Sequence, residues 1–120
     1  MSEVKPVRIQ RSRQHKQISP NSLPIVYVGR PTKCGNPYKV VGQEGHWFVF
    51  DTEINSAILT FDNKDSALDC CLELYKEYIS HKHNSSKINL DELKGKNLSC
   101  WCSLNDKCHI DVLLKLISEL

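Results

Sequence analysis

Short apolar runs alternate with amphipathic segments along the chain, and the short runs predict strands. The run "PIVYVG" (24–29) is β-branched and aromatic and is closed by a glycine, which is typical of a buried strand. The run "NLSCWC" (97–102) has the same character. Two further runs, "HWFVF" (46–50) and "AILTF" (57–61), are joined by a polar turn and predict an antiparallel hairpin.

Two longer segments have the 3.6-residue period of amphipathic helices. The first, "NKDSALDCCLELYKEYISHKH" (63–83), can be capped by Asp65 or Ser66. Its apolar stripe consists of Ala67, Leu68, Cys71, Leu72, Tyr75, Tyr78 and Ile79. The second helix begins near Cys108, and its predicted inward residues are Val112, Leu113, Leu116, Ile117 and Leu120. Between the helices, "NLDELKG" predicts a short helical turn that ends at Gly95.

Strands interspersed with helices in 120 residues predict an α/β fold. We expect one small domain over residues 24–120, preceded by a basic N-terminal arm over residues 1–23. The expected architecture is a mixed sheet with a parallel core pair, flanking helices and one antiparallel hairpin. If the strands at 24–29 and 97–102 are parallel neighbours, the loops that follow them meet at the carboxyl edge of the sheet, where open α/β sheets bind ligands.

Charge is distributed unevenly along the chain. Residues 4–43 contain eight Lys or Arg and no acidic residue, whereas residues 44–120 contain eight Lys or Arg and thirteen Asp or Glu; with Glu3, +8 − 5 − 1 gives the net charge of +2. The basic third is where an anionic partner is expected. The start of the chain lacks the apolar core of a secretory signal, and no apolar run is long enough for a membrane span. We therefore expect a cytoplasmic protein with no membrane partner, whose six cysteines are thiols or metal ligands.

Three cysteines and one histidine fall within ten residues, in "CWCSLNDKCH" (100–109). One interpretation is a metal site, because Cys100, Cys102, Cys108 and His109 supply the four ligands that tetrahedral zinc requires. The C-x-C spacing differs from the C-x2-C of common zinc knuckles, and on an extended strand it places both cysteines on one face. Zinc is the cofactor that the sequence indicates.

Two other interpretations of this cluster stay open. Cys108 stands where the last helix begins, and the positive end of a helix lowers a cysteine's pKa. Cys108 and His109 are therefore candidate catalytic residues, with Lys107 beside them. Alternatively, Cys100 and Cys102 are small packing residues of a buried strand, and His109 bonds to a loop carbonyl or helps to cap the helix.

Basic and turn-forming residues share the loop "GRPTKCGNP" that follows the first buried strand. Its glycines allow a ligand to approach the backbone closely, its cations suit phosphate or carboxylate, and its asparagine both donates and accepts hydrogen bonds. The loop is predicted to bind a nucleotide phosphate through Gly29, Arg30, Lys33, Gly35 and Asn36. The alternative is a basic surface loop whose Gly and Pro residues serve geometry only.

The N-terminal arm carries a second group of cations, in "RIQRSRQHK". Arg8, Arg11 and Arg13, followed by His15 and Lys16, form an electrostatic footprint that suits a nucleic-acid backbone. A charge run of this kind is also typical of a solvated tail, and it does not imply base readout.

Four segments together resemble the domain-of-unknown-function family 4326, which is found widely in bacteria and their viruses. They are "RIQRSR" (8–13), "VYVGRPTKCGNP" (26–37), "LELY" (72–75) and the segment with "CWC" and "CHIDVLL" (93–114). This chain has Cys34 where the family usually has a tryptophan, so a platform for stacking on a ligand would be lost if that tryptophan provides one. The resemblance implies a shared fold and a shared site, and suggests a viral or mobile-element origin, which would place the protein in the host-cell cytoplasm.

Two functions follow as hypotheses. In the first, the protein binds a nucleotide, a nucleoside or a nucleic-acid end through Arg30, Lys33 and Asn36, and acts on it as a thiol-dependent transferase or hydrolase through Cys108 and His109. In the second, a non-catalytic module held together by zinc binds nucleic acid or a host protein. The sequence leaves open which of these holds, and the oligomeric state with it.

Overall fold

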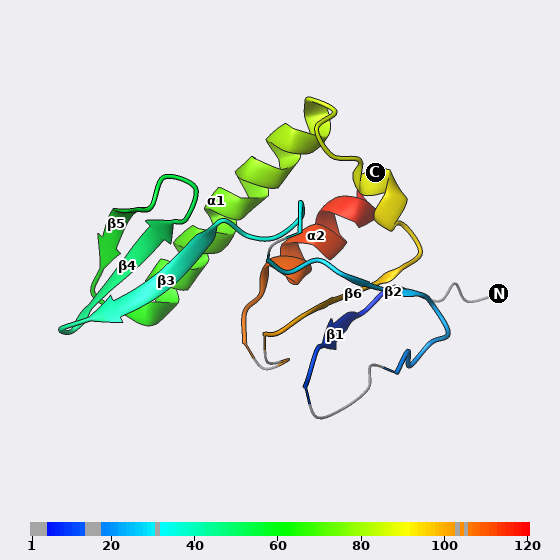
Figure 1. Ribbon diagram of the computed structural model, residues 1–120, viewed down its shortest axis with the longest axis horizontal. Helices are drawn as coiled ribbons and strands as arrows, with labels where there is room; N and C mark the ends of the chain where they lie inside the picture. Colours follow the sequence, from blue (N-terminus) through cyan, green and yellow to red (C-terminus); the bar gives the residue numbers. More distant parts are fainter. Residues whose placement is uncertain (1–4, 14–17, 31, 103, 105) are drawn as a thin grey trace.

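Two three-stranded sheets and two α-helices make up the part of the chain that the structure describes: residues 5–13, 18–30, 32–102, 104 and 106–120. Figure 1 shows this computed structural model. The elements are β1 (Arg8–Gln10), β2 (Ile25–Tyr27), β3 (Tyr38–Gln43), β4 (His46–Asp51), β5 (Ser56–Phe61), α1 (Lys64–Asn84), the 3-10 helix η1 (Leu90–Leu93), β6 (Asn97–Cys100) and α2 (His109–Ser118). The predicted α/β fold with its parallel core pair and antiparallel hairpin is confirmed, and the two kinds of pairing occur in separate sheets. No helix in the described ranges is both long and apolar enough to cross a membrane.

The parallel sheet has the strand order β1-β6-β2. β2 and β6 are parallel neighbours, as predicted, with Val26 aligned with Leu98. β1, from the predicted basic arm, pairs with the other edge of β6 and aligns Ile9 with Ser99. Because parallel strands end at the same edge of a sheet, the loops after β2 and β6 lie close together although they are far apart in the sequence.

The antiparallel sheet has the order β3-β4-β5 and contains one strand that the sequence analysis missed, β3. Its connection to β4 is a two-residue turn of Glu44 and Gly45, both with positive φ (52° and 80°), which is the backbone geometry of the commonest hairpin loops. In Figure 1 this sheet lies to one side of the molecule, along α1.

Helix α1 begins at Lys64, and its cap is Asn63 rather than the predicted Asp65 or Ser66, two or three residues later; the Asn63 side chain accepts the Ser66 amide at 2.8 Å. The residues of the stripe that are fully buried are Ala67, Cys71, Tyr75 and Ile79. Helix α2 buries Ile110, Leu113 and Ile117 against the same core as Val28 and Leu98. The predicted inward position of Leu120 is wrong: the helix ends at Ser118, so Leu120 leaves the helical period and is 47% exposed.

Buried hydrogen bonds of Asn97 join the segment before β2 to the parallel sheet. Asn97 of β6 is completely buried, and its side-chain oxygen accepts the Val7 amide at 3.0 Å. Its side-chain nitrogen donates to Asn21 at 2.8 Å and to Ser19 at 3.2 Å. Segments on both sides of β1 are therefore tied to the central strand.

Candidate functional site

The thiols of Cys100, Cys102 and Cys108 converge where β6 ends. Cys100 is the last residue of the strand, and the chain then turns so that the Cys102 amide donates to the Cys100 sulfur at 3.4 Å. The Cys100 and Cys108 sulfurs are 3.1 Å apart, and all three sulfurs lie within 4.8 Å of one another. This turn brings the Cys100 and Cys102 side chains together. On an extended strand, the two sulfurs of a C-x-C segment would lie on neighbouring pleats of one face.

His109 lies beside this cluster and contacts one of its members, Cys108. It is the first residue of α2 and is 8% exposed, with its ring edge-on to Tyr75 at 5.2 Å between centroids. Its Nε2 lies 3.0 Å from the Val28 carbonyl oxygen. Because a carbonyl only accepts, Nε2 carries the hydrogen, and the lone pair of Nδ1 faces the Cys108 sulfur at 3.5 Å.

The three thiols differ sharply in their affinity for protons. Hydrogen bonds with Cys100, and then with Cys108, hold the pKa of Cys102 far below its usual range. The pKa of Cys108 is raised, first by its hydrogen bond with Cys100, then by that with Cys102 and by burial. The helix start acts in the predicted direction, because a hydrogen bond with the Ile110 backbone lowers the Cys108 pKa, but the bonds with the other two thiols and burial outweigh it.

The cluster could hold a metal ion. Tetrahedral zinc with bonds of about 2.3 Å places its sulfur ligands roughly 3.7 Å apart, so the observed sulfurs need move only a little to meet one ion. Thiolate and imidazole ligands suit soft or borderline ions rather than magnesium or calcium. A histidine ligand that donates its other nitrogen to a backbone carbonyl, as His109 does to Val28, is the usual supporting arrangement at such sites.

Two adjoining pockets, of about 200 and 260 Å³, open beside the cluster. Arg30, Asn36, Cys102 and His109 line both of them. The first pocket is completed by Tyr27, Gly29, Cys100 and Trp101. The polar residues among those that complete the second are Tyr38, Lys39, Lys64 and Lys107. The two loops that the parallel pair was expected to bring together therefore share one site at the carboxyl edge of the sheet.

The loop after β2 places only part of its predicted binding set at this site. Gly29, Arg30 and Asn36 line the pockets, whereas Lys33 is exposed and lines neither. Gly35 is buried behind the loop, where an added Cβ would meet the Arg30 backbone at 3.1 Å. Gly35 thus shapes the loop by allowing close backbone contact.

The arginines of the arm have different environments. The Arg8 guanidinium donates to the carbonyls of Leu104 and Asp106 and pairs with Asp111 at 3.0 Å, which fastens the loop between β6 and α2. Arg11 lies over the rings of both Tyr27 and Trp101, at 4.7 and 5.3 Å from their centroids.

The third arginine of the arm also reaches the site: Arg13 lies 5.9 Å from the Trp101 ring centroid. His15 and Lys16 lie outside the described residues. The sequence analysis missed Tyr27 and Trp101 as site residues; an aromatic residue at the end of each buried strand, near a basic arm, was the available signal.

Cys34 lies away from both pockets. It is half-buried and packs against the core, its carbonyl accepts the Tyr75 hydroxyl, and burial raises the pKa of its thiol. Residue 34 therefore forms no wall of either pocket.

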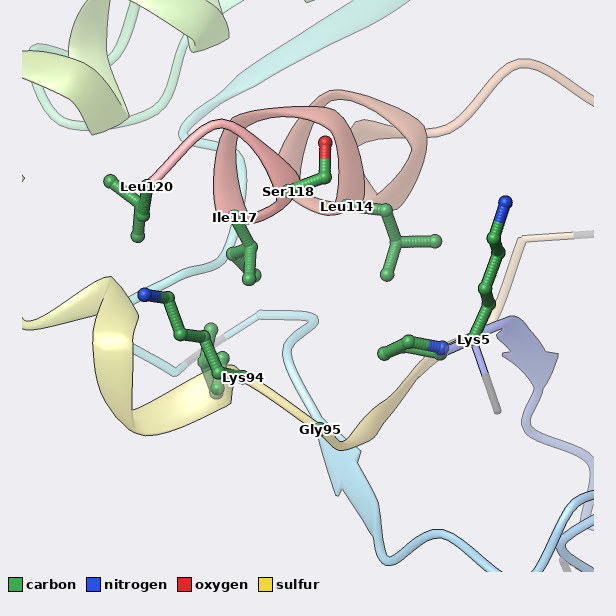
Figure 2. A pocket seen from close by; sticks show the side chains of 9 residues that line it. Lys5, Lys94, Gly95, Leu114, Ile117, Ser118 and Leu120 are labelled. Atoms are coloured by element: carbon green, nitrogen blue, oxygen red, sulfur yellow. The ribbon is translucent and has the colours of Figure 1, made fainter. Parts of the chain in front are cut away.

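A separate hollow of about 470 Å³ lies at the amino ends of β1 and β6, the opposite edge of the parallel sheet. Figure 2 shows Leu114 and Ile117 of α2 at this hollow, with Lys5 and Lys94 at its sides. None of the predicted site residues lines it.

Fold and site together define a small α/β domain with a metal-capable cysteine cluster beside a basic pocket. The chain belongs to the domain of unknown function family DUF4326, whose model matches residues 7–119. No curated protein and no solved structure matches the chain.

Proposed function

We propose that this protein is a zinc-stapled module that binds a nucleotide or a nucleic-acid end in the pocket beside the cysteine cluster. One observation carries the proposal: a thiol–imidazole cluster forms one wall of a pocket that Arg30 and Asn36 also line. The stack of Arg11 on Tyr27 and Trp101 supplies a cation and aromatic surface at the same pocket. Phosphate and base would then have separate partners.

Zinc is the ion that three thiols and one imidazole favour, with Cys100, Cys102, Cys108 and His109 as its ligands. Elemental analysis of the purified full chain tests this. We expect about one zinc per chain, loss of that zinc in Cys102→Ser, and no loss in Cys70→Ser, whose thiol is on α1 and outside the cluster. A wild-type chain that stays metal-free after incubation with zinc would refute the proposed zinc site.

Anion binding is tested separately, with adenosine monophosphate and inorganic phosphate titrated into the zinc-loaded chain. Arg30→Gln should weaken binding of both about 10-fold or more, the usual value of a charged hydrogen bond. Lys33→Gln is the matched control, because Lys33 stands in the same loop but lines neither pocket. Equal losses of affinity in both variants would contradict binding in the pocket that Arg30 lines. A zinc-loaded chain that binds neither nucleotides nor nucleic acid would leave a host protein as the partner class.

A second candidate function, thiol-dependent transferase or hydrolase chemistry on the bound nucleotide, is favoured by the position of Cys102. This residue is half-buried and lines both pockets, whereas Cys108 is 2% exposed. Iodoacetamide, which forms a thioether at a thiolate and releases iodide, should therefore modify Cys102 first in the metal-free chain. Bound nucleotide should slow that reaction. Modification of Cys108 before Cys102 would exclude Cys102 as the reacting thiol.

A further inference from the structure

The two pockets beside the cysteine cluster adjoin each other along a shared wall. They share four wall residues: Arg30, Asn36, Cys102 and His109. At about 200 and 260 Å³, each is smaller than the roughly 300 Å³ at which pockets that enclose a small molecule begin. A ligand that lies along both pockets matches this shape better than one enclosed in either.

We propose that the ligand is a single strand of nucleic acid longer than one nucleotide; this inference rests on the proposed function. Its path runs from the Arg11–Trp101 stack, past Arg30, into the pocket beside Lys64 and Lys107.

Positive charge is present along the whole path. Arg11 and Arg13 stand at one end, Arg30 in the shared wall, and Lys64 and Lys107 at the other end. Among the described residues that line either pocket there is no Asp or Glu. A groove that follows a chain of phosphates requires such an unbroken set of cations.

Acidic residues stand next to one of these cations without lining either pocket. Asp69 and Asp65 of α1 lie 2.7 and 4.0 Å from the Lys107 ammonium and offset part of its charge. The Lys64 ammonium instead lies over the Trp47 ring, 5.8 Å from its centroid. Lys39, the third lysine of this pocket, likewise lies over a ring, that of Phe50. Replacing Lys64 therefore tests the path more directly than replacing Lys107.

The aromatic end of the path favours a single strand over a duplex. Trp101 is 48% exposed, and two arginines, Arg11 and Arg13, lie over its ring. Exposed rings interleaved with arginines bind unstacked bases, whose faces are accessible only in single strands. Stacking of this kind tolerates any base, so little sequence preference is expected.

Fluorescence anisotropy of the zinc-loaded full chain with labelled oligothymidylates of about two to ten nucleotides, compared with thymidine monophosphate, tests the path. Affinity should rise at least 10-fold from the monophosphate to the longer strands and fall steeply with salt. Trp101→Ala should weaken strand binding about 5- to 100-fold while keeping its zinc.

Lys64→Gln should weaken strand binding more than it weakens binding of the monophosphate, whereas Lys33→Gln should change neither. Strands that bind no tighter than the monophosphate would overturn the extended path and leave the proposed function intact. A duplex that binds as tightly as a single strand would also overturn it. Absence of binding to monophosphate and strands alike would instead refute the proposed function.

Discussion

Replacing Arg8 by methionine tests whether this arginine stabilises the fold by holding the loop between β6 and α2. Its side chain is 9% exposed and donates to two backbone carbonyls of the loop that carries Cys102. Hydrogen bonds from a charged donor contribute about 1.5–3 kcal/mol each when both partners are buried. Here the carbonyls belong to the exposed Leu104 and Asp106, which water can solvate after the change, and the partner Asp111 is 60% exposed and adds less than about 1 kcal/mol.

We therefore expect Arg8→Met to lower the free energy of unfolding by about 2 kcal/mol, the lower part of that range. With a urea m-value of about 2 kcal/mol/M, the unfolding midpoint should fall by about 1 M. Both proteins are measured with chelator present, because bound zinc would stabilise the folded state by mass action. Arg13→Met is the matched control, since Arg13 is exposed and lies over Trp101 at 5.9 Å. If the Arg8 variant loses no more stability than the control, the fastening role is wrong.

Three further changes test the packing around the site. Gly35→Ala places a methyl group 3.1 Å from the Arg30 backbone and should destabilise the fold by about 1–3 kcal/mol in urea unfolding; an unchanged midpoint would contradict the close packing. Burial raises the pKa of Cys71 from 9.0 to about 11, so at pH 8 its thiolate fraction is about 100-fold below that of an unperturbed thiol, and alkylation followed by mass spectrometry should accelerate as pH rises toward 11. Alkylation of Cys71 at the same rate in native and urea-unfolded protein would argue against that burial. Tyr75→Phe removes the hydroxyl that donates to the Cys34 carbonyl and should cost about 1–2 kcal/mol in the same unfolding assay, whereas full retention of stability would mean that water replaces the hydroxyl.

Local patterns in the sequence were enough to find the parallel pair but not β3. The strands at 24–29 and 97–102 are marked by their own apolar residues, whereas β3 has a short run at Val40 and becomes a strand through its partner, with Val40 opposite Val49 of β4. The signal that could have found β3 is the turn of Glu44 and Gly45, because a glycine in a two-residue loop between apolar runs indicates a hairpin.

The residue at which β6 ends could not be predicted from the sequence either. Alternation of apolar residues continues through Trp101, so the sequence favoured a strand to residue 102, but the strand ends at Cys100. This difference leaves Trp101 exposed, where Arg11 lies over it, and turns Cys102 back toward Cys100. Periodicity reports which residues are apolar and not where the backbone stops pairing.

The orientation of His109 shows why the sequence could not choose between a metal site and a thiol site. Adjacent side chains at a helix start point in different directions, so the sequence alone does not bring Cys108 and His109 to one ion. The Val28 carbonyl, distant in the sequence, takes the Nε2 hydrogen of His109 and thereby turns the Nδ1 lone pair to the Cys108 sulfur. That carbonyl is in place because β2 pairs with β6, since the Val28 amide bonds to the Ser99 carbonyl just before Cys100. The pairing that forms the sheet thus also places the imidazole next to the Cys108 thiol, beside the three cysteines that could hold a metal ion.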